Sequence, residues 1–92
     1  MQGTTKSGYE FKIDDRILSD WRFVETLTKC EDKSSSAFEK LAGIQTMAKL
    51  LFGDKYDEYM KFIASKNNGY CPSEVIMGEI TEIFQSANNS KN

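Results

Sequence analysis

The chain has 92 residues, with 14 acidic and 12 basic side chains, a net charge of −2 and no histidine. A chain of this length forms one domain with a single core and little room for a deep internal cavity. The charge balance argues against nucleic acid as a ligand, because phosphate binding needs a clustered excess of Lys and Arg. Its only arginines are Arg16 and Arg22, and no apolar stretch approaches the roughly 18 residues of a membrane span.

The N-terminal part predicts extended structure. Residues 1–8 lack the apolar middle of a signal peptide, and we expect them to be a flexible leader. Residues 9–13 alternate apolar and polar side chains, which predicts a short β-strand. The pair Asp14-Asp15 resembles a turn, and residues 16–18 can return as a second strand. Two short strands are not stable alone, so they must lie on the helices or pair with another molecule.

A first helix is expected to begin at Ser19 or Asp20, where a short side-chain oxygen can accept from free backbone N–H groups. It ends near Glu31. One side is apolar, as in an amphipathic helix with one buried stripe. That stripe holds Phe23, Val24 and Leu27, with Trp21 and Cys30 at its margins.

A second helix is expected over residues 36–52, because Ser36 followed by Glu39 is a capping-box pattern. Its apolar residues reach nearly all round the helical wheel. Such a helix is either central in its fold or covered by a partner, and in so small a domain we expect some of its apolar surface to be shared with another molecule. Gly43 can permit close approach of another helix, or it is simply a tolerated weak helix former.

Gly53 suits a position after a helix where the backbone has a positive φ angle. Asp54 is expected to cap a third helix that ends near Lys66. Pro72 or Ser73 is expected to start a fourth, and residues 88–92 to be a disordered tail. The predicted fold is therefore mainly α, with about four helices in a compact bundle and a short N-terminal β-strand or hairpin, in a single domain over residues 9–87.

Residues with the chemistry of catalysis are scarce. Histidine, the commonest general base and metal ligand, is missing, and the adjacent carboxylate pairs lack the spacing of a calcium loop. Cys30 and Cys71 are expected to be reduced thiols and half-buried small residues, with a single disulfide as the alternative. We therefore predict no enzyme activity, no metal and no cofactor.

Aromatic residues gather at the corner between the second and third helices: Phe52, Tyr56, Tyr59 and Phe62. We expect them in the core rather than stacked on a single-stranded nucleic acid, since acidic residues lie among them. The alternative is a mixed arrangement, in which their inner edges lie in the core and their outer edges contact a partner protein. On the wheel argument alone, the predicted partner-binding residues are Ile44, Met47, Leu50, Leu51, Phe52, Tyr56 and Tyr59.

The order of these parts resembles a known family. A segment with Phe and Ile leads into an Asp-Trp helix over residues 20–27, and a later helix ends in Leu-Leu-Phe-Gly at 50–53, with Tyr56 just beyond. After Asn68-Gly69 comes a last helix over residues 75–84, and then a tail ending in Lys-Asn. Over residues 9–92 this resembles the small tail assembly chaperones of long-tailed phages that infect Gram-positive bacteria.

The resemblance implies a non-enzymatic protein that coats the tape measure protein, keeps it soluble and recruits tail tube subunits. It also implies self-association, action in the host bacterial cytoplasm and absence from the mature virion. Family members are similar to the short product of a frameshifted pair whose longer product has an extra C-terminal domain. The family supplies no catalytic residues and no motif that assigns partner contacts.

Two other functions fit the composition less well. A small helical DNA-binding regulator needs a basic recognition helix, and none of the expected helices is basic. A redox protein or enzyme that uses Cys30 or Cys71 needs an activated thiol, and no base is available beside either residue.

Overall fold

The computed structural model describes the backbone of residues 1–89 and the side chains of residues 1–86. Over this range a short antiparallel hairpin precedes four α-helices, so the prediction of a mainly α fold with an N-terminal hairpin is confirmed. The elements are β1 (Gln2–Thr4), β2 (Glu10–Lys12), the 3-10 helix η1 (Asp15–Ser19), α1 (Trp21–Glu31), α2 (Ala37–Phe52), the 3-10 helix η2 (Gly53–Lys55), α3 (Tyr56–Lys66) and α4 (Ser73–Asn89).

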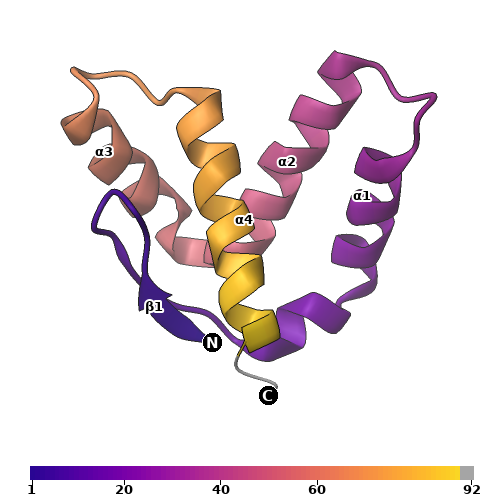
Figure 1. Ribbon diagram of the computed structural model, residues 1–92, viewed down its shortest axis with the longest axis horizontal. Coiled ribbons are helices and arrows are strands. Elements are labelled where there is room, and N and C mark those ends of the chain that lie inside the picture. Colours follow the sequence, from indigo (N-terminus) through magenta and orange to yellow (C-terminus); the bar gives the residue numbers. More distant parts are fainter. Residues whose placement is uncertain (90–92) are drawn as a thin grey trace.

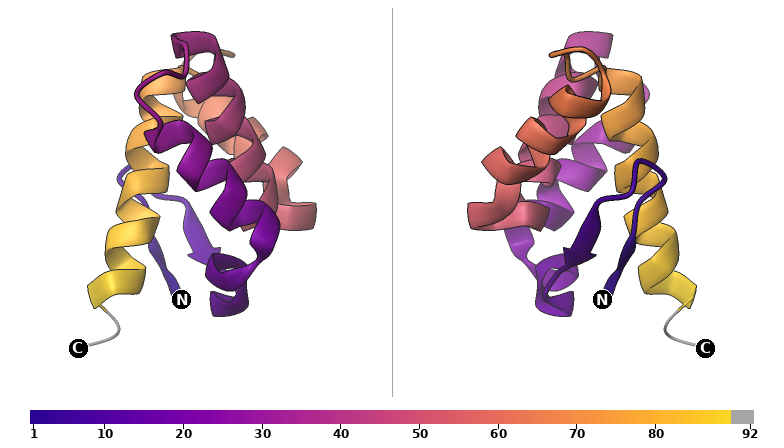
Figure 2. Two further views of the ribbon diagram at one scale, coloured as in Figure 1. Left: turned by 90° about the vertical axis from the view of Figure 1, so that its right-hand side faces the viewer. Right: turned by 90° about the vertical axis from the view of Figure 1, so that its left-hand side faces the viewer.

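The helices form two antiparallel pairs that diverge like the arms of a V (Figure 1). One pair is α1 with α2, and the other is α3 with α4. The hairpin lies against α3 and α4, as the right-hand view of Figure 2 shows. An edge-on contact between Phe23 of α1 and Phe84 of α4, with ring centroids 5.4 Å apart, links the two pairs.

The hairpin corrects the prediction of a flexible leader over residues 1–8. Residues 2–4 form β1 and pair with β2, with Gly3 opposite Phe11. The chain reverses between Thr5 and Tyr9, where Gly8 adopts a φ angle of +97° that residues with a Cβ rarely adopt. The strand predicted from the alternation in residues 9–13 is confirmed as β2. Its partner strand, β1, precedes it in the chain, whereas the sequence predicted a partner that follows it.

Residues 16–18 were proposed as a possible returning strand, and this was wrong. They belong to η1, because the Asp14 side chain accepts a hydrogen bond from the backbone N–H of Arg16 and turns the chain into a 3-10 helix. A short aspartate side chain that bonds to its own backbone two residues on is a common local competitor of extended structure.

The helix starts follow the predicted caps in two cases. Asp20 accepts from the N–H of Arg22 at the start of α1, and Ser36 and Glu39 form a reciprocal capping box at the start of α2. Asp54 does not cap α3, since α3 begins at Tyr56 after the 3-10 turn and without a side-chain cap. Gly53 does end α2 with a positive φ of 54°.

The predicted tail over residues 88–92 is corrected in part, because α4 runs through Asn89. Residues 90–92 lie outside the described residues. Pro72 precedes α4, where its carbonyl accepts from the N–H groups of Val75 and Ile76.

The core lies where the hairpin meets the helices. Tyr59, Phe23, Ile63 and Ile83 are the largest fully buried side chains. Tyr9 packs edge-on against Phe52, Tyr59 and Phe62, and the rings of Phe52 and Tyr59 stack with centroids 4.3 Å apart. Tyr9 therefore joins the hairpin, the end of α2 and the inner face of α3 into one aromatic cluster.

Gly43 lies where α1 and α2 approach each other closely. A Cβ placed on Gly43 would lie 2.4 Å from the Sγ atom of Cys30 and 3.6 Å from the Cγ2 atom of Thr26. Of the two interpretations of Gly43, close helix approach is the one confirmed. Cys30 and Cys71 do not form a disulfide with each other. Cys30 is half-buried as expected, but Cys71 is exposed, which corrects the expectation for that residue.

We expect Gly43→Ala to lower the free energy of unfolding by about 1–2 kcal/mol, because overpacking at the Cys30 contact exceeds the gain in helix propensity. In a Cys30→Ala background the same change should be neutral or stabilising by up to about 1 kcal/mol, since the obstructing sulfur is gone. Urea denaturation of the four proteins of this double-mutant cycle measures both values. Equal effects of Gly43→Ala in the two backgrounds would contradict the contact.

Candidate functional site

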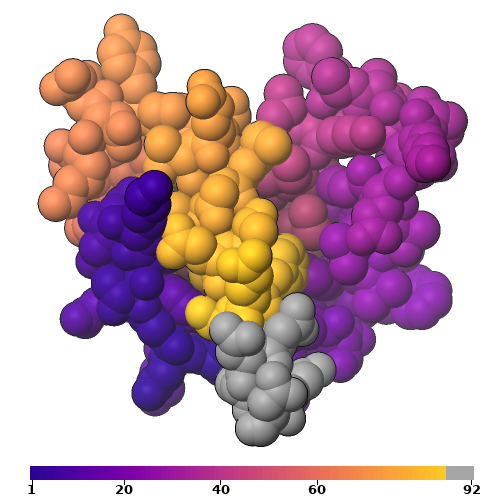
Figure 3. Space-filling model, viewed as in Figure 1, coloured from indigo at the N-terminus to yellow at the C-terminus, as the bar shows by residue number. Residues whose placement is uncertain are grey.

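An apolar groove opens between the N-terminal halves of α2 and α4, with α3 behind it. Its volume is about 430 Å³. Figure 3 shows the notch at the top of the molecule between the first turns of the two helices. Twelve residues, mostly apolar, line this α2–α4 groove: Phe38, Leu41, Ala42, Ile44, Gln45, Ala48, Tyr56, Met60, Cys71, Ser73, Ile76 and Met77.

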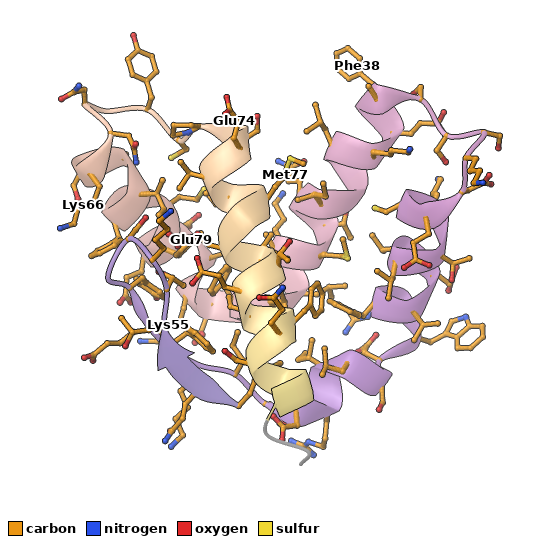
Figure 4. All side chains as sticks on the ribbon, viewed as in Figure 1. Phe38, Lys55, Lys66, Glu74, Met77 and Glu79 are labelled. Carbon is orange, nitrogen blue, oxygen red and sulfur yellow. The ribbon has the colours of Figure 1, made fainter. Side chains whose placement is uncertain are left out.

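The open ends of the groove carry exposed apolar side chains. Phe38 is 85% exposed at the first turn of α2, and Leu41 is 44% exposed one turn later. Across the groove Met77 of α4 is 39% exposed. Figure 4 shows Phe38 at the tip of α2 and Met77 on the side of α4 that faces α2. Exposed apolar side chains around one concave surface make this groove the candidate binding site.

The helical repeat explains how α2 presents this wall. Phe38, Leu41 or Ala42, Gln45 and Ala48 recur every three or four residues, so they lie along one side of the helix. From Phe38 to Ala48 the wall is about 15 Å long, or about three helical turns. No side chain lining the groove carries a charge at neutral pH. The groove therefore suits an uncharged, apolar ridge of comparable length.

The seven predicted partner-binding residues divide into two groups. Met47, Leu51, Phe52 and Tyr59 are core residues with exposed fractions of 5% or less, so the predicted contact is corrected for these four. The hairpin covers the helix corner where they were expected to be exposed. Ile44, Leu50 and Tyr56 are partly buried, and of these Ile44 and Tyr56 line the groove.

The expectation that α2 has more apolar surface than its own fold covers is confirmed by Phe38 and Leu41. The wheel had included both residues in the all-round apolar set. The helical wheel does not show which side of α2 packs against each neighbouring helix. Met77, which adjoins the buried Ile76, was not among the predicted partner-binding residues.

α1 also differs from its predicted stripe. Phe23 is buried, but Val24 and Leu27 are 36% and 37% exposed, and Trp21 is 72% exposed. The reason is that α1 meets α2 through Thr26 and Cys30, which face Gly43. The exposed side of α1 lies outside the α2–α4 groove.

Glu79 is a buried carboxylate, 2% exposed, and such groups are candidates for chemistry. Its Oε1 atom accepts from the Tyr59 hydroxyl at 2.9 Å, and its Oε2 atom accepts from the backbone N–H of Ser7 at 2.9 Å. The neighbouring Glu82 accepts from the N–H of Lys6 at 3.1 Å. Two carboxylates of α4 thus hold the turn of the hairpin.

The electrostatics of Glu79 match a structural role. Burial raises its pKa, but hydrogen bonds from Ser7, Thr5 and Tyr59 outweigh burial and leave the pKa below its ordinary value. Burial and the hydrogen bond to Glu79 raise the pKa of Tyr59. A charged carboxylate bonded to a neutral phenol and to backbone N–H groups is a stable arrangement that favours neither a general acid nor a general base.

No protein-family model, curated protein or solved structure matches this chain. Within residues 1–89, no helix combines the length and the apolar character needed to cross a membrane. The same part of the chain contains no group of three or more His, Cys, Asp or Glu residues arranged to hold a metal ion.

We expect Glu79→Gln to lower the free energy of unfolding at pH 7 by about 1–3 kcal/mol, because it removes charge-assisted hydrogen bonds to the hairpin turn. The folded-state pKa of Glu79 is lowered, so its contribution is fully present above the ordinary glutamate pKa of about 4.3 and is lost as the pH falls through the lowered value. The difference between wild type and variant should therefore shrink in acid.

Urea denaturation at pH 7 and at pH 3 measures that difference. Arg16 and Arg22 hold the pKa values of Asp14 and Asp20 at about 2 through side-chain hydrogen bonds, and these groups titrate equally in both proteins. A stability difference that stays constant between the two pH values would show that the Glu79 charge does not stabilise the hairpin.

Proposed function

We propose that this protein is a phage tail assembly chaperone that binds the tape measure protein through the α2–α4 groove and helps to recruit tail tube subunits. The observation that supports the proposal best is the exposure of Phe38 and Leu41 on the rim of an uncharged groove. The resemblance of residues 9–92 to small tail assembly chaperones supports the same role.

The groove favours an amphipathic helix as the bound segment. Helix-in-groove recognition uses apolar anchors at helical spacing on the ligand and a hydrophobic groove on the receptor. A tape measure protein is long and helical, and its apolar surface must be shielded until the tail tube encloses it. A groove about three turns long shields one short stretch, so many copies are needed along one tape measure.

The proposed role is non-catalytic and is carried out in the host bacterial cytoplasm during assembly, with the chaperone absent from the mature virion. Release on tube assembly requires binding of moderate strength. A short groove with two strongly exposed anchors is consistent with that requirement, since affinity is concentrated in a few well-packed anchor residues.

Replacing Phe38 and Leu41 with Ser should weaken capture of a helical tape measure fragment at least about tenfold, because two apolar anchors are lost. The matched control replaces Trp21 and Leu27 with Ser, which removes exposed apolar side chains of α1 outside the groove. Isothermal titration or a quantitative pull-down with co-expressed fragments measures the effect. Circular dichroism and the urea midpoint establish that each variant is folded.

Equal weakening by the groove variant and the α1 variant would contradict binding in the groove. Failure of the wild-type protein to bind any fragment of the tape measure protein encoded nearby would contradict the chaperone function itself.

A further inference from the structure

The outer edge of the hairpin is an unpaired β-strand. The N–H of Ile13 donates to the carbonyl of Met1 at 2.7 Å, and the N–H of Thr5 donates to the carbonyl of Tyr9 at 2.9 Å. The odd-numbered residues in 9–13 thus direct their backbone N–H and C=O groups toward the first strand of the hairpin. Glu10 and Lys12 stand in the alternate pairs of the ladder, so their N–H and C=O groups point away from β1.

Among the residues that the structure describes, β1 is the only strand that pairs with β2. β1 is the strand of the hairpin that lies beside α4, which leaves β2 as the outer strand (Figure 2). Beside β2 is a cleft of about 210 Å³ whose other wall includes Lys55 and Glu58 of the α2–α3 corner. Figure 4 places Lys55 next to the hairpin. In the described part of the chain, no hydrogen bond is made to the outward backbone groups of Glu10 and Lys12.

The side chains of residues 9–13, which include β2, alternate between two faces. Tyr9, Phe11 and Ile13 are buried in the core, whereas Glu10 and Lys12 are exposed on the other face. The edge therefore carries one negative and one positive side chain, two residues apart, and both lie on the exposed face of the hairpin. Lys55 and Glu58 nearby form an ion pair, with Nζ and Oε2 3.5 Å apart, so together they add no net charge beside the edge.

We propose that β2 is a self-association edge, at which the β2 strands of two copies of this chain pair antiparallel and join two hairpins into a four-stranded sheet. This surface is separate from the α2–α4 groove. The family resemblance implies self-association, and the proposal adds the surface and the strand register through which it occurs. The pairing is two-fold symmetric and places Phe11 of one copy opposite Phe11 of the other. Glu10 of each copy then lies directly opposite Lys12 of the second copy.

Charge favours this register over the two nearest symmetric registers. Only residues with outward backbone groups can form the hydrogen-bonded pairs, so the neighbouring alternatives are centred on Glu10 or on Lys12. Centring on Glu10 places two glutamates opposite each other. Centring on Lys12 places two lysines opposite each other and sets Glu10 against Asp14. Opposite charges at directly facing positions stabilise a β-pair, and like charges destabilise it.

The edge is complementary to itself, as a two-fold interface requires. Unpaired strand edges are templates for pairing, and a lysine on an edge usually opposes it. In the proposed dimer Lys12 lies opposite Glu10 of the second copy. The charges that oppose other edge contacts therefore favour this pairing. Because three-residue strands supply few hydrogen bonds, the dimer should be weak and visible only through its concentration dependence.

The test is sedimentation equilibrium of wild type, Glu10→Lys, Lys12→Glu and the double exchange, at low salt over a wide concentration range. We expect wild type and the double exchange to dimerise, because both keep opposite charges facing. Each single variant places like charges at both facing positions and should dimerise about tenfold more weakly. The side chains are exposed and face the neutral Thr4 and Gln2 within the hairpin, so folding should be unaffected.

The decisive sample is an equimolar mixture of the two single variants. In the mixed dimer each lysine of one copy faces a glutamate of the other, so association should return to the wild-type level and weaken on adding salt. Single variants that associate as strongly as wild type, or a mixture that does not recover, would overturn the proposal. The proposal would also be overturned if the wild-type protein stayed monomeric at every concentration, and if the NMR signals of the Glu10 and Lys12 amides changed only when a different protein paired with β2.

Discussion

The burial of Tyr9 is the interaction on which the rest of this structure depends. Its ring touches Phe52 at the end of α2 and both Tyr59 and Phe62 on α3, while the turn before it is held by Glu79 of α4. A short hairpin has no stability of its own in water. It exists because these contacts anchor it, and in return it closes a helix corner that four helices alone leave open.

Features set by local chemistry could be predicted from the sequence. The cap at Asp20, the capping box at Ser36 and Glu39, and the break at Gly53 follow from side-chain hydrogen bonds and backbone sterics within a few residues. The pairing of residues 2–4 with residues 10–12 could not be predicted in this way. Its stability comes from α3 and α4, more than forty residues later in the chain, and no local pattern encodes that support.

The candidate site shows the same division. The three sides of α2 differ in what they contact. Gly43 packs against α1, Met47 and Leu51 lie in the core, and Phe38 and Leu41 border the open groove. Helical periodicity predicted that α2 has surplus apolar surface, but it could not assign sides, because the assignment is made by tertiary packing. Four of the residues expected at a partner are therefore buried in the core, whereas Ile44 and Tyr56 line the groove.

The placement of the two thiols has a practical consequence. Cys71 is exposed and lies in the wall of the groove, where its Sγ atom is 3.3 Å from the carbonyl oxygen of Met60. Cys30 lies against Gly43, and burial raises its pKa. Because the thiolate is the reactive form, a maleimide dye should attach to Cys71 first. The native sequence thus carries its own attachment point for a fluorescent reporter of groove occupancy.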